Sequence, residues 1–160
     1  MLRGDIGRLE LKAGSNVQDT CVVHCFPGKD VVVEENGHVG HGAILHGCTV
    51  GCNALIGMNA VLMDDVVVGE NSIVGALSFV KERTIIPPST LWAGSPAQQI
   101  RELSDKEIGW KTRGTEVYQH LSQRHLATEQ EVAPLPQADE ARLAQRVPDL
   151  LYETKRTNRD

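Results

Sequence analysis

The sequence predicts a mainly β fold, a left-handed parallel β-helix (hexapeptide repeat) followed by a C-terminal α-helix. Aliphatic residues recur at every sixth position through the middle of the chain, and a helix-capping sequence follows them. The central in-phase residues are Val50, Ile56, Leu62, Val68, Val74 and Val80. A six-residue period fits neither an α-helix nor an alternating strand. It is typical of a β-helix in which each hexad forms one short strand and a corner, and three hexads form a triangular coil.

Upstream of Val50 the six-residue phase is broken twice. The earlier in-phase residues are Leu11, Val17, Val23, Val33 and Val39. Residues 26 to 30 add about four extra residues after Val23, and their Phe-Pro-Gly-Lys-Asp sequence predicts a loop that leaves the coil. Between Val39 and Ile44 the step is only five residues, which predicts one missing residue there.

The repeat is predicted to stop after Val80. Residues 87 to 96, with Pro-Pro and Gly-Ser-Pro, read as an irregular connection. Ser104 followed by Glu107 is a capping box that predicts a helix over about residues 104 to 125. Because the side or end of a solenoid needs cover, we expect this helix to pack on the β-helix.

Three regions follow from these patterns. Residues 1 to 100 form the β-helix domain, residues 101 to 128 carry the C-terminal helix, and residues 129 to 160 form a polar tail interrupted by prolines. The tail has the potential for a short helix near residues 139 to 147. We expect it to become ordered against a partner subunit.

Composition excludes several classes of function. The chain has 16 Lys and Arg against 21 Asp and Glu, a formal charge of −5, and no basic stripe, which argues against nucleic-acid binding. The sequence has neither an apolar stretch of membrane-spanning length nor a leader signal, so we expect a soluble, cytoplasmic protein. The cysteines form no CxxC pair and are expected to be small buried apolar residues: Cys21, Cys25, Cys48 and Cys52.

Three histidines are predicted to hold a metal ion between subunits. His24 follows Val23 directly, and His46 lies two residues past Ile44, or one past Leu45, depending on where the short step falls. Both then lie on the same side, one coil apart, and coils about 4.8 Å apart let two imidazoles converge on one ion. His41 lies on a different face and joins them only from a neighbouring subunit of a three-fold homotrimer. The remaining histidines show no matching register and are expected at the surface: His38, His120 and His125.

These motifs together resemble the γ-class carbonic anhydrase family. The motifs are Arg3-Gly4-Asp5, Asn16-Val17-Gln18-Asp19, His24, and the stretch from Gly37 to Cys48 that contains His41 and His46. The match runs from residue 2 to about residue 100. Residues 35 to 48 and the helix segment 110 to 119 resemble more particularly the PaaY and CaiE branch, the proteins of phenylacetate degradation and of the carnitine operon. That branch includes acyl-CoA thioesterases.

The resemblance implies a role for each matching residue. The metal ligands would be His24 and His46 of one subunit and His41 of its neighbour. Zinc is the default for three imidazoles, and Fe²⁺ or Co²⁺ fits the same ligands. Gln18 would hydrogen-bond the metal-bound water, and Asn16 would support the same pocket. A charged network across the subunit interface, or alternatively a purely structural ion pair, would comprise Arg3, Asp5 and Asp19.

The implied chemistry is attack by a metal-bound hydroxide on a small-molecule substrate. Two departures from the prototype carbonic anhydrases bear on the choice of substrate. Ile6 stands where an acidic residue follows the Arg-Gly-Asp motif, and residues 25 to 29 offer no glutamate. The missing acids argue against rapid proton export. Together with the resemblance to the PaaY and CaiE branch, they rank hydrolysis of an acyl-CoA thioester first and conversion of carbon dioxide to bicarbonate second. A hexapeptide acyltransferase and a non-catalytic metal-binding scaffold are the remaining alternatives.

Relatives also have β-helix coils before the Arg-Gly-Asp motif, whereas this sequence begins two residues ahead of it. An abrupt start would leave unpaired strand edges. The sequence therefore predicts either a shortened start or a different cover for that edge.

Overall fold

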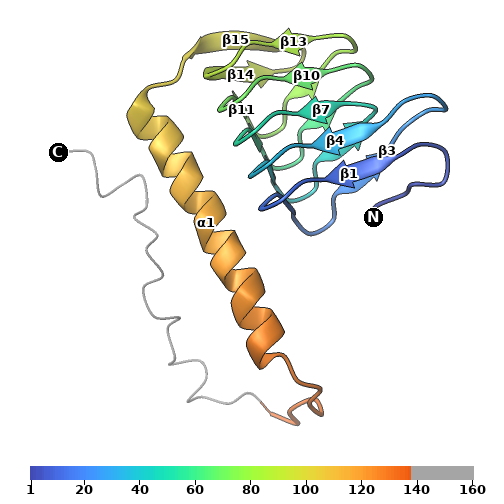
Figure 1. Ribbon diagram of the computed structural model, residues 1–160, viewed down its shortest axis with the longest axis vertical. Helices are drawn as coiled ribbons and strands as arrows, with labels where there is room; N and C mark the ends of the chain where they lie inside the picture. The colour runs from blue at the N-terminus through green and yellow to red at the C-terminus, as the bar shows by residue number, and fades with distance from the viewer. Residues whose placement is uncertain (138–160) are drawn as a thin grey trace. The chain divides into compact units, whose positions relative to one another are not determined.

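The computed structural model describes residues 1–137, and their architecture is a parallel β-helix followed by one α-helix (Figure 1). Short strands stack into three sheets, which form the sides of the coil. Sheet A comprises β3 (Val22–His24), β6 (Ile44–His46), β9 (Val61–Leu62) and β12 (Phe79–Val80). Sheet B comprises β1 (Leu9–Leu11), β4 (Val31–Val33), β7 (Thr49–Val50), β10 (Val67–Val68) and β13 (Ile85–Ile86). The predicted fold class is confirmed.

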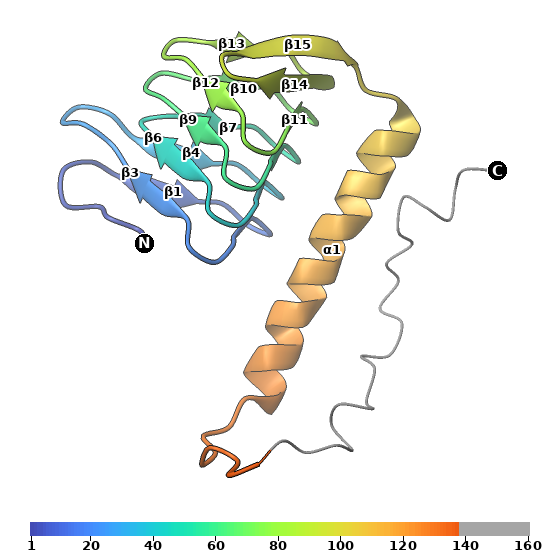
Figure 2. The same cartoon turned by 180° about the vertical axis from the view of Figure 1, so that it is seen from behind.

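Sheet C closes the triangle and carries the only antiparallel pair in the described part of the chain. It comprises β2 (Asn16–Val17), β5 (His38–Val39), β8 (Leu55–Ile56), β11 (Ile73–Val74), β14 (Thr90–Gly94) and β15 (Ala97–Glu102). Successive strands of the chain lie on successive sheets, so each coil stacks in register on the one before (Figure 2).

The core is a narrow column of aliphatic side chains, one from each hexad. The in-phase residues from Val23 to Ile86 are at most 1% exposed. Leu45 belongs to this column with no exposed surface, whereas Ile44 is 39% exposed, so the predicted short step between Val39 and Ile44 is wrong. The missing residue lies after Leu45 instead, where Gly47 turns the corner with a φ of 56° that glycine adopts without strain.

The repeat also continues beyond Val80. Ile86, six residues on, is 1% exposed, and Trp92 pairs with Val74 and packs against the core. The two prolines at 87 and 88 do not end the coil. They follow β13 at a corner, where the backbone N–H that proline lacks is not needed for strand pairing. Residues 95 and 96 form the turn of the antiparallel hairpin β14–β15, and Gly94 pairs with Ala97 across it, so this segment is not an irregular connection.

Other local features agree with the sequence expectations or depart from them. Residues 26 to 30 form a loop between β3 and β4, as predicted. Three of the four cysteines are buried, but Cys52 is exposed because it lies at a corner outside the strands. No helix within residues 1–137 has the length and apolar character needed to cross a bilayer. The short helix predicted near residues 139 to 147 lies outside the described residues.

Helix α1 (Asp105–Thr128) begins at the predicted capping box. The backbone N–H of Ser104 donates to the Glu107 carboxylate over 3.1 Å, and Arg101 pairs with the same carboxylate at 2.6 Å. Hydrogen bonds from Arg101, which have the larger effect, and from Ser104 lower the pKa of Glu107 to about 2. The helix runs without interruption through Gly109 and Gly114. The chain divides into two compact units within this helix, residues 1–115 and 116–160.

The first turns of α1 pack on sheet C of the same unit through a buried lysine. Lys111 is 2% exposed, and its ammonium donates to the Asn36 carbonyl over 2.8 Å and to Asn53 Oδ1 over 2.7 Å. Both acceptors are neutral. Burial therefore lowers the pKa of Lys111 from 10.5 to about 7.

The free energy of unfolding should consequently depend on the protonation of Lys111. Between pH 7 and 10.5 the unfolded chain binds more protons at this residue than the folded chain, so stability should rise with pH, by at most about 1.4 kcal/mol per pH unit. Denaturant unfolding at several pH values measures the slope. Lys111→Met should reduce the slope of the free energy of unfolding against pH. Lys106→Met, which replaces an exposed lysine of the same helix, should leave the slope unchanged, and equal slopes in the two variants would refute the expectation.

Candidate metal centre

His24 and His46 lie in register on the outward face of sheet A. β3 pairs with β6 so that the two histidines are directly opposite each other, and their ring centroids are 5.5 Å apart. Val23 and Leu45 point into the core, and alternation along each strand turns the next residue outward. The predicted stacking of these two imidazoles, one coil apart, is confirmed.

The same face of sheet A carries a row of apolar side chains, which we call the sheet A stripe. Val22 and Ile44 are 41% and 39% exposed. The stripe consists of the outward residues that pair in register, Val22, Ile44, Val61 and Phe79. Partly exposed apolar side chains in a continuous row are typical of a surface that packs against another chain. The histidine pair therefore lies beside a candidate interface.

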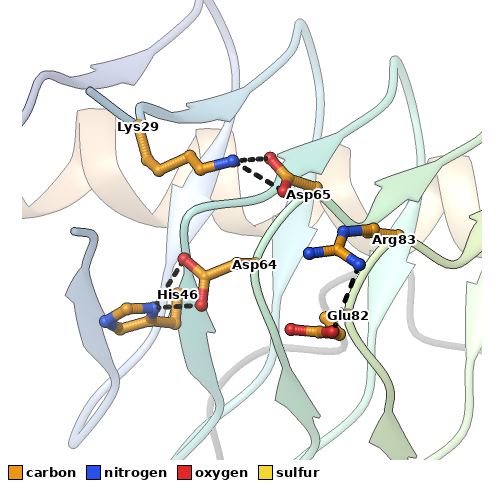
Figure 3. A network of polar contacts seen from close by, with 6 residues as sticks. All are labelled: Lys29, His46, Asp64, Asp65, Glu82 and Arg83. Atoms are coloured by element: carbon orange, nitrogen blue, oxygen red, sulfur yellow. Dashed lines mark hydrogen bonds and ion pairs between the residues drawn. The ribbon is translucent and has the colours of Figure 1, made fainter. Parts of the chain in front are cut away.

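Asp64 orients His46. Both carboxylate oxygens lie 3.0 Å from His46 Nδ1, and Asp64 is only 8% exposed (Figure 3). The carboxylate accepts a hydrogen bond from Nδ1–H, which leaves the lone pair on Nε2 for a metal ion. The sequence interpretation missed Asp64. Coils at this place are 17 residues apart, as Ile44 and Val61 show, so an acidic residue 18 positions after His46, one past the in-register position, is the signal that could have found it.

Neutralising Asp64 should weaken metal binding. Asp64→Asn removes the negative charge that orients the imidazole and increases its basicity, so metal affinity should fall about 10- to 100-fold. Competition with a coloured chelator measures the affinity. Asp65→Asn is the matched control, since the neighbouring Asp65 contacts Lys29 rather than a histidine. Wild-type affinity in Asp64→Asn would contradict the orienting role.

The loop of residues 26 to 30 lies beside the histidine pair. The Phe26 ring is 4.7 Å from the His46 ring in an edge arrangement, while 59% of Phe26 remains exposed. Lys29 anchors the loop by donating to both oxygens of Asp65 at 2.5 and 2.6 Å (Figure 3). An apolar ring at this place offers a surface for the apolar part of a ligand near the histidines.

Arg3 and Asp5 both contact His24 of the same chain. Arg3 Nη2 lies 2.8 Å from His24 Nε2, Asp5 Oδ1 lies 3.2 Å from the same nitrogen, and the two side chains pair with each other at 3.2 Å. A nitrogen that accepts from a guanidinium carries its lone pair outward, as a metal ligand must. A metal ion on His24 would take the place of Arg3 there.

His41 and Asp19 lie apart from the histidine pair. His41 is in the corner before β6 begins, whereas His46 is at the end of that strand. Asp19 Oδ2 is 3.2 Å from His41 Nδ1, so Asp19 does not join Arg3 and Asp5 in a single network within the chain. Among residues 1–137 no three His, Cys, Asp or Glu side chains gather tightly enough to hold an ion. One chain therefore offers two imidazoles at one place and a third at another.

Asn16 and Gln18 gather around His38 on sheet C. Gln18 Nε2 lies 2.7 Å from His38 Nε2, and Asn16 Nδ2 lies 3.2 Å from His38 Nδ1. His38 is 9% exposed, and Thr115 of helix α1 contacts it at 3.2 Å, so the prediction that His38 is a surface residue was wrong. Burial lowers the pKa of His38 to about 4. Its spacing of 22 residues from Asn16, equal to that between His24 and His46, could have revealed the pairing.

His120 and His125 are exposed on helix α1, as expected. The donor set on sheet A suits a zinc-like ion, because two stacked imidazoles each present a lone pair and one is backed by a carboxylate. The residues that would hold an ion are His24 and His46, with one further ligand needed from elsewhere.

Comparison with known proteins supports the fold and the family. The model of the bacterial transferase hexapeptide (six repeats) matches residues 47–82. The carnitine operon protein CaiE of Citrobacter koseri is 50% identical over 88% of this chain and 72% of its own length, and that of Salmonella typhimurium is 52% identical over 88% and 71%. These relatives belong to one of the two groups in the predicted branch, and the likeness to PaaY stays a prediction.

Two crystal structures are similar in fold. A hexapeptide transferase family protein from Anaplasma phagocytophilum superposes with a TM-score of 0.74 and 38% identity, covering 78% of this chain and 73% of that one. A Bacillus cereus protein described as a candidate acetyltransferase gives 0.72 and 30%, covering 80% and 85%. With half of its aligned residues shared with CaiE and the same repeat in its coils, the chain belongs to the hexapeptide-repeat family of the carnitine operon proteins CaiE.

Proposed function

We propose that this protein is a homotrimeric, metal-dependent hydrolase of acyl-CoA thioesters. The observation that carries the proposal is the in-register pair of His24 and His46 on an outward sheet face, with Asp64 holding one of them. Two imidazoles so placed are half of a catalytic zinc site, which takes three protein ligands and leaves one position open.

The sheet A stripe supports the trimer. Hexapeptide-repeat proteins commonly form trimers, and a three-fold axis brings the same pair of surfaces together three times. His24 and His46 end strands whose first residues, Val22 and Ile44, belong to the stripe. A subunit packed on this face would approach the histidine pair, and His41 at its own corner is the ligand that it would bring.

The proposed reaction gives several side chains of the candidate site a defined task. When bound, a divalent ion supplies an acidified water and polarises the thioester carbonyl. His24 and His46 would hold the ion, and Asp64 keeps the proton of His46 on Nδ1. His41 of the partner subunit would complete the ligand set. Gln18 would present its side-chain amide to the reacting water, and Phe26 would pack against the acyl group.

The thioester is favoured over carbon dioxide by what surrounds the histidines. Ile6 is 43% exposed and Phe26 is 59% exposed, so apolar side chains stand where a proton-exporting enzyme would carry acids. Carbonic anhydrase is the second candidate, because it needs the same ligands. Acyl transfer is the third, since relatives are described as transferases; it would use the same acyl donor with an acceptor other than water.

A side-by-side assay tests the proposal. The zinc-loaded protein is given a series of acyl-CoA thioesters and, separately, carbon dioxide, and a chelator-treated sample serves as the control. We expect metal-dependent release of free CoA thiol that exceeds the rate of carbon dioxide hydration. Hydration without thioester cleavage would favour the second candidate, and thiol release only when an acceptor amine or alcohol is present would favour the third.

The loop of residues 26 to 30 should determine which acyl groups fit. Phe26→Ala removes the ring beside His46, so kcat/KM for long or aromatic acyl groups should fall about tenfold relative to acetyl, which corresponds to about 1.4 kcal/mol of lost apolar contact. The ratio of kcat/KM values measures the change. Val132→Ala, an exposed apolar residue elsewhere, is the control, and an unchanged ratio in Phe26→Ala would place the loop outside the pocket.

A further inference from the structure

We infer that His38 is a positioning residue that determines which end of the Gln18 side-chain amide is left for the reacting water. The inference rests on the proposed function only through the task given to Gln18. Its basis is the buried cluster on sheet C, in which one imidazole contacts Gln18 at 2.7 Å and Asn16 at 3.2 Å through its two different nitrogens.

A neutral imidazole cannot accept from both amides. His38 is buried, and the low pKa that burial gives it keeps the ring uncharged near pH 7. An uncharged ring carries one N–H and one lone pair. The amides of Asn16 and Gln18 must therefore turn opposite ends to it, one its NH₂ group and the other its carbonyl oxygen. Which end each amide turns toward the ring follows from the other hydrogen bonds of the network.

Thr115 indicates which nitrogen carries the hydrogen. The Thr115 hydroxyl lies 3.5 Å from the Lys111 carbonyl one helical turn earlier, which is the usual acceptor for a threonine within a helix. Its oxygen then accepts from His38 Nδ1–H over 3.2 Å. The lone pair of His38 is consequently on Nε2, where the Gln18 NH₂ group donates to it at 2.7 Å.

This arrangement leaves the Gln18 carbonyl oxygen as the group available to a ligand. Gln18 precedes Asp19, whose carboxylate contacts His41, so the amide belongs to the corner that supplies the third imidazole in the proposed trimer. A carbonyl oxygen accepts a hydrogen bond from water and thereby orients the lone pairs of the water away from itself. The reversed amide would donate to those lone pairs and compete for them.

The tautomer of His38 is measurable without any activity. Two-bond ¹⁵N–¹H correlation spectra of protein labelled at histidine distinguish Nδ1–H from Nε2–H, and His38→Gln assigns the signal. We expect Nδ1–H in the wild type. Gln18→Glu replaces the donor with an acceptor and should move the hydrogen to Nε2, whereas Gln123→Glu, exposed in helix α1, should not. An Nε2–H wild type, or a Gln18→Glu variant that keeps Nδ1–H, would overturn the inference.

Kinetics test the consequence. His38→Leu removes the nitrogen that accepts from Gln18, so kcat for thioester hydrolysis should fall about tenfold, with bound metal and KM unchanged. This is in the range found when residues that support a metal site without binding the metal are replaced. His38→Gln places an acceptor oxygen near the position of Nε2 and should restore most of the rate. If His38→Leu does not fold, Thr115→Val removes one of the two groups that contact Nδ1, leaving Asn16, and should shift the tautomer mixture. A folded His38→Leu variant with wild-type kcat would refute the positioning role.

The two failures are distinguishable. A wild type that binds no metal and cleaves no thioester refutes the proposed function, while the spectra still report whether His38 and Gln18 are coupled. An active wild type whose rate is unchanged by substitution of His38 refutes only the positioning role of His38.

Discussion

His24→Ala and His46→Ala should each reduce bound metal from about one ion per subunit to a trace, and thioester hydrolysis should be lost with it. The physical reason is the small number of ligands. A catalytic zinc site has about three protein ligands, and losing one leaves too few bonds to retain the ion against water or chelator. Elemental analysis after gel filtration measures the occupancy directly.

The matched control for metal occupancy is an exposed histidine far from sheet A in the sequence. His125→Ala removes an exposed imidazole on helix α1 and should retain full occupancy. Since His24 points outward from the core, His24→Ala should not lower the melting temperature of the metal-free protein appreciably. His46→Ala leaves the largely buried Asp64 carboxylate without its imidazole partner, so some decrease is expected for that variant. Full occupancy in either sheet A variant would show that the ligand assignment is wrong.

Mixing His41→Ala subunits with His24→Ala subunits should restore part of the activity that each variant lacks. If the site lies between subunits, an intact centre forms wherever a subunit that keeps His24 and His46 faces one that keeps His41. In a random equal mixture about a quarter of all interfaces meet this condition, and each mixed trimer has one such interface. Activity after co-refolding should therefore approach about a quarter of the wild-type value.

Two measurements make the mixing experiment decisive. Differently tagged subunits, captured in sequence, show that mixed trimers have formed. A mixture of His24→Ala with His46→Ala is the control, because both variants lose a ligand on the same side of the interface and no pairing repairs it. Recovery in that control, or none in mixed trimers of the test pair, would show that the three histidines do not act across an interface.

Much of the fold could be predicted from the sequence because a solenoid repeats one local rule. The six-residue period of inward aliphatic side chains predicted the coils, and the capping box at Ser104 predicted where helix α1 begins. The stacking of His24 on His46 followed from the same counting, since coils in register bring residues of equal phase together. These features depend on spacing alone.

The remainder depends on contacts that spacing does not give. Ile44 and Leu45 are both aliphatic, and only the pairing of β6 with its neighbours determines which one points inward. His38 is buried because helix α1, distant in sequence, lies over it with Thr115. Asp64 contacts His46 because Gly47 makes the corner tight enough for the next coil to come close. Each of these requires knowledge of which segments meet in space.

The two departures from the six-residue period fall at the same corner of the triangle, directly after His24 and directly after His46. One lengthens the corner by the loop of residues 26 to 30, and the other shortens it at Gly47. Corners of a solenoid tolerate insertions and deletions because strand pairing on either side keeps the coils in register. Evolution can therefore resize the surroundings of a fixed pair of imidazoles by changes in corner length alone, so relatives that retain both histidines are free to diverge in substrate size.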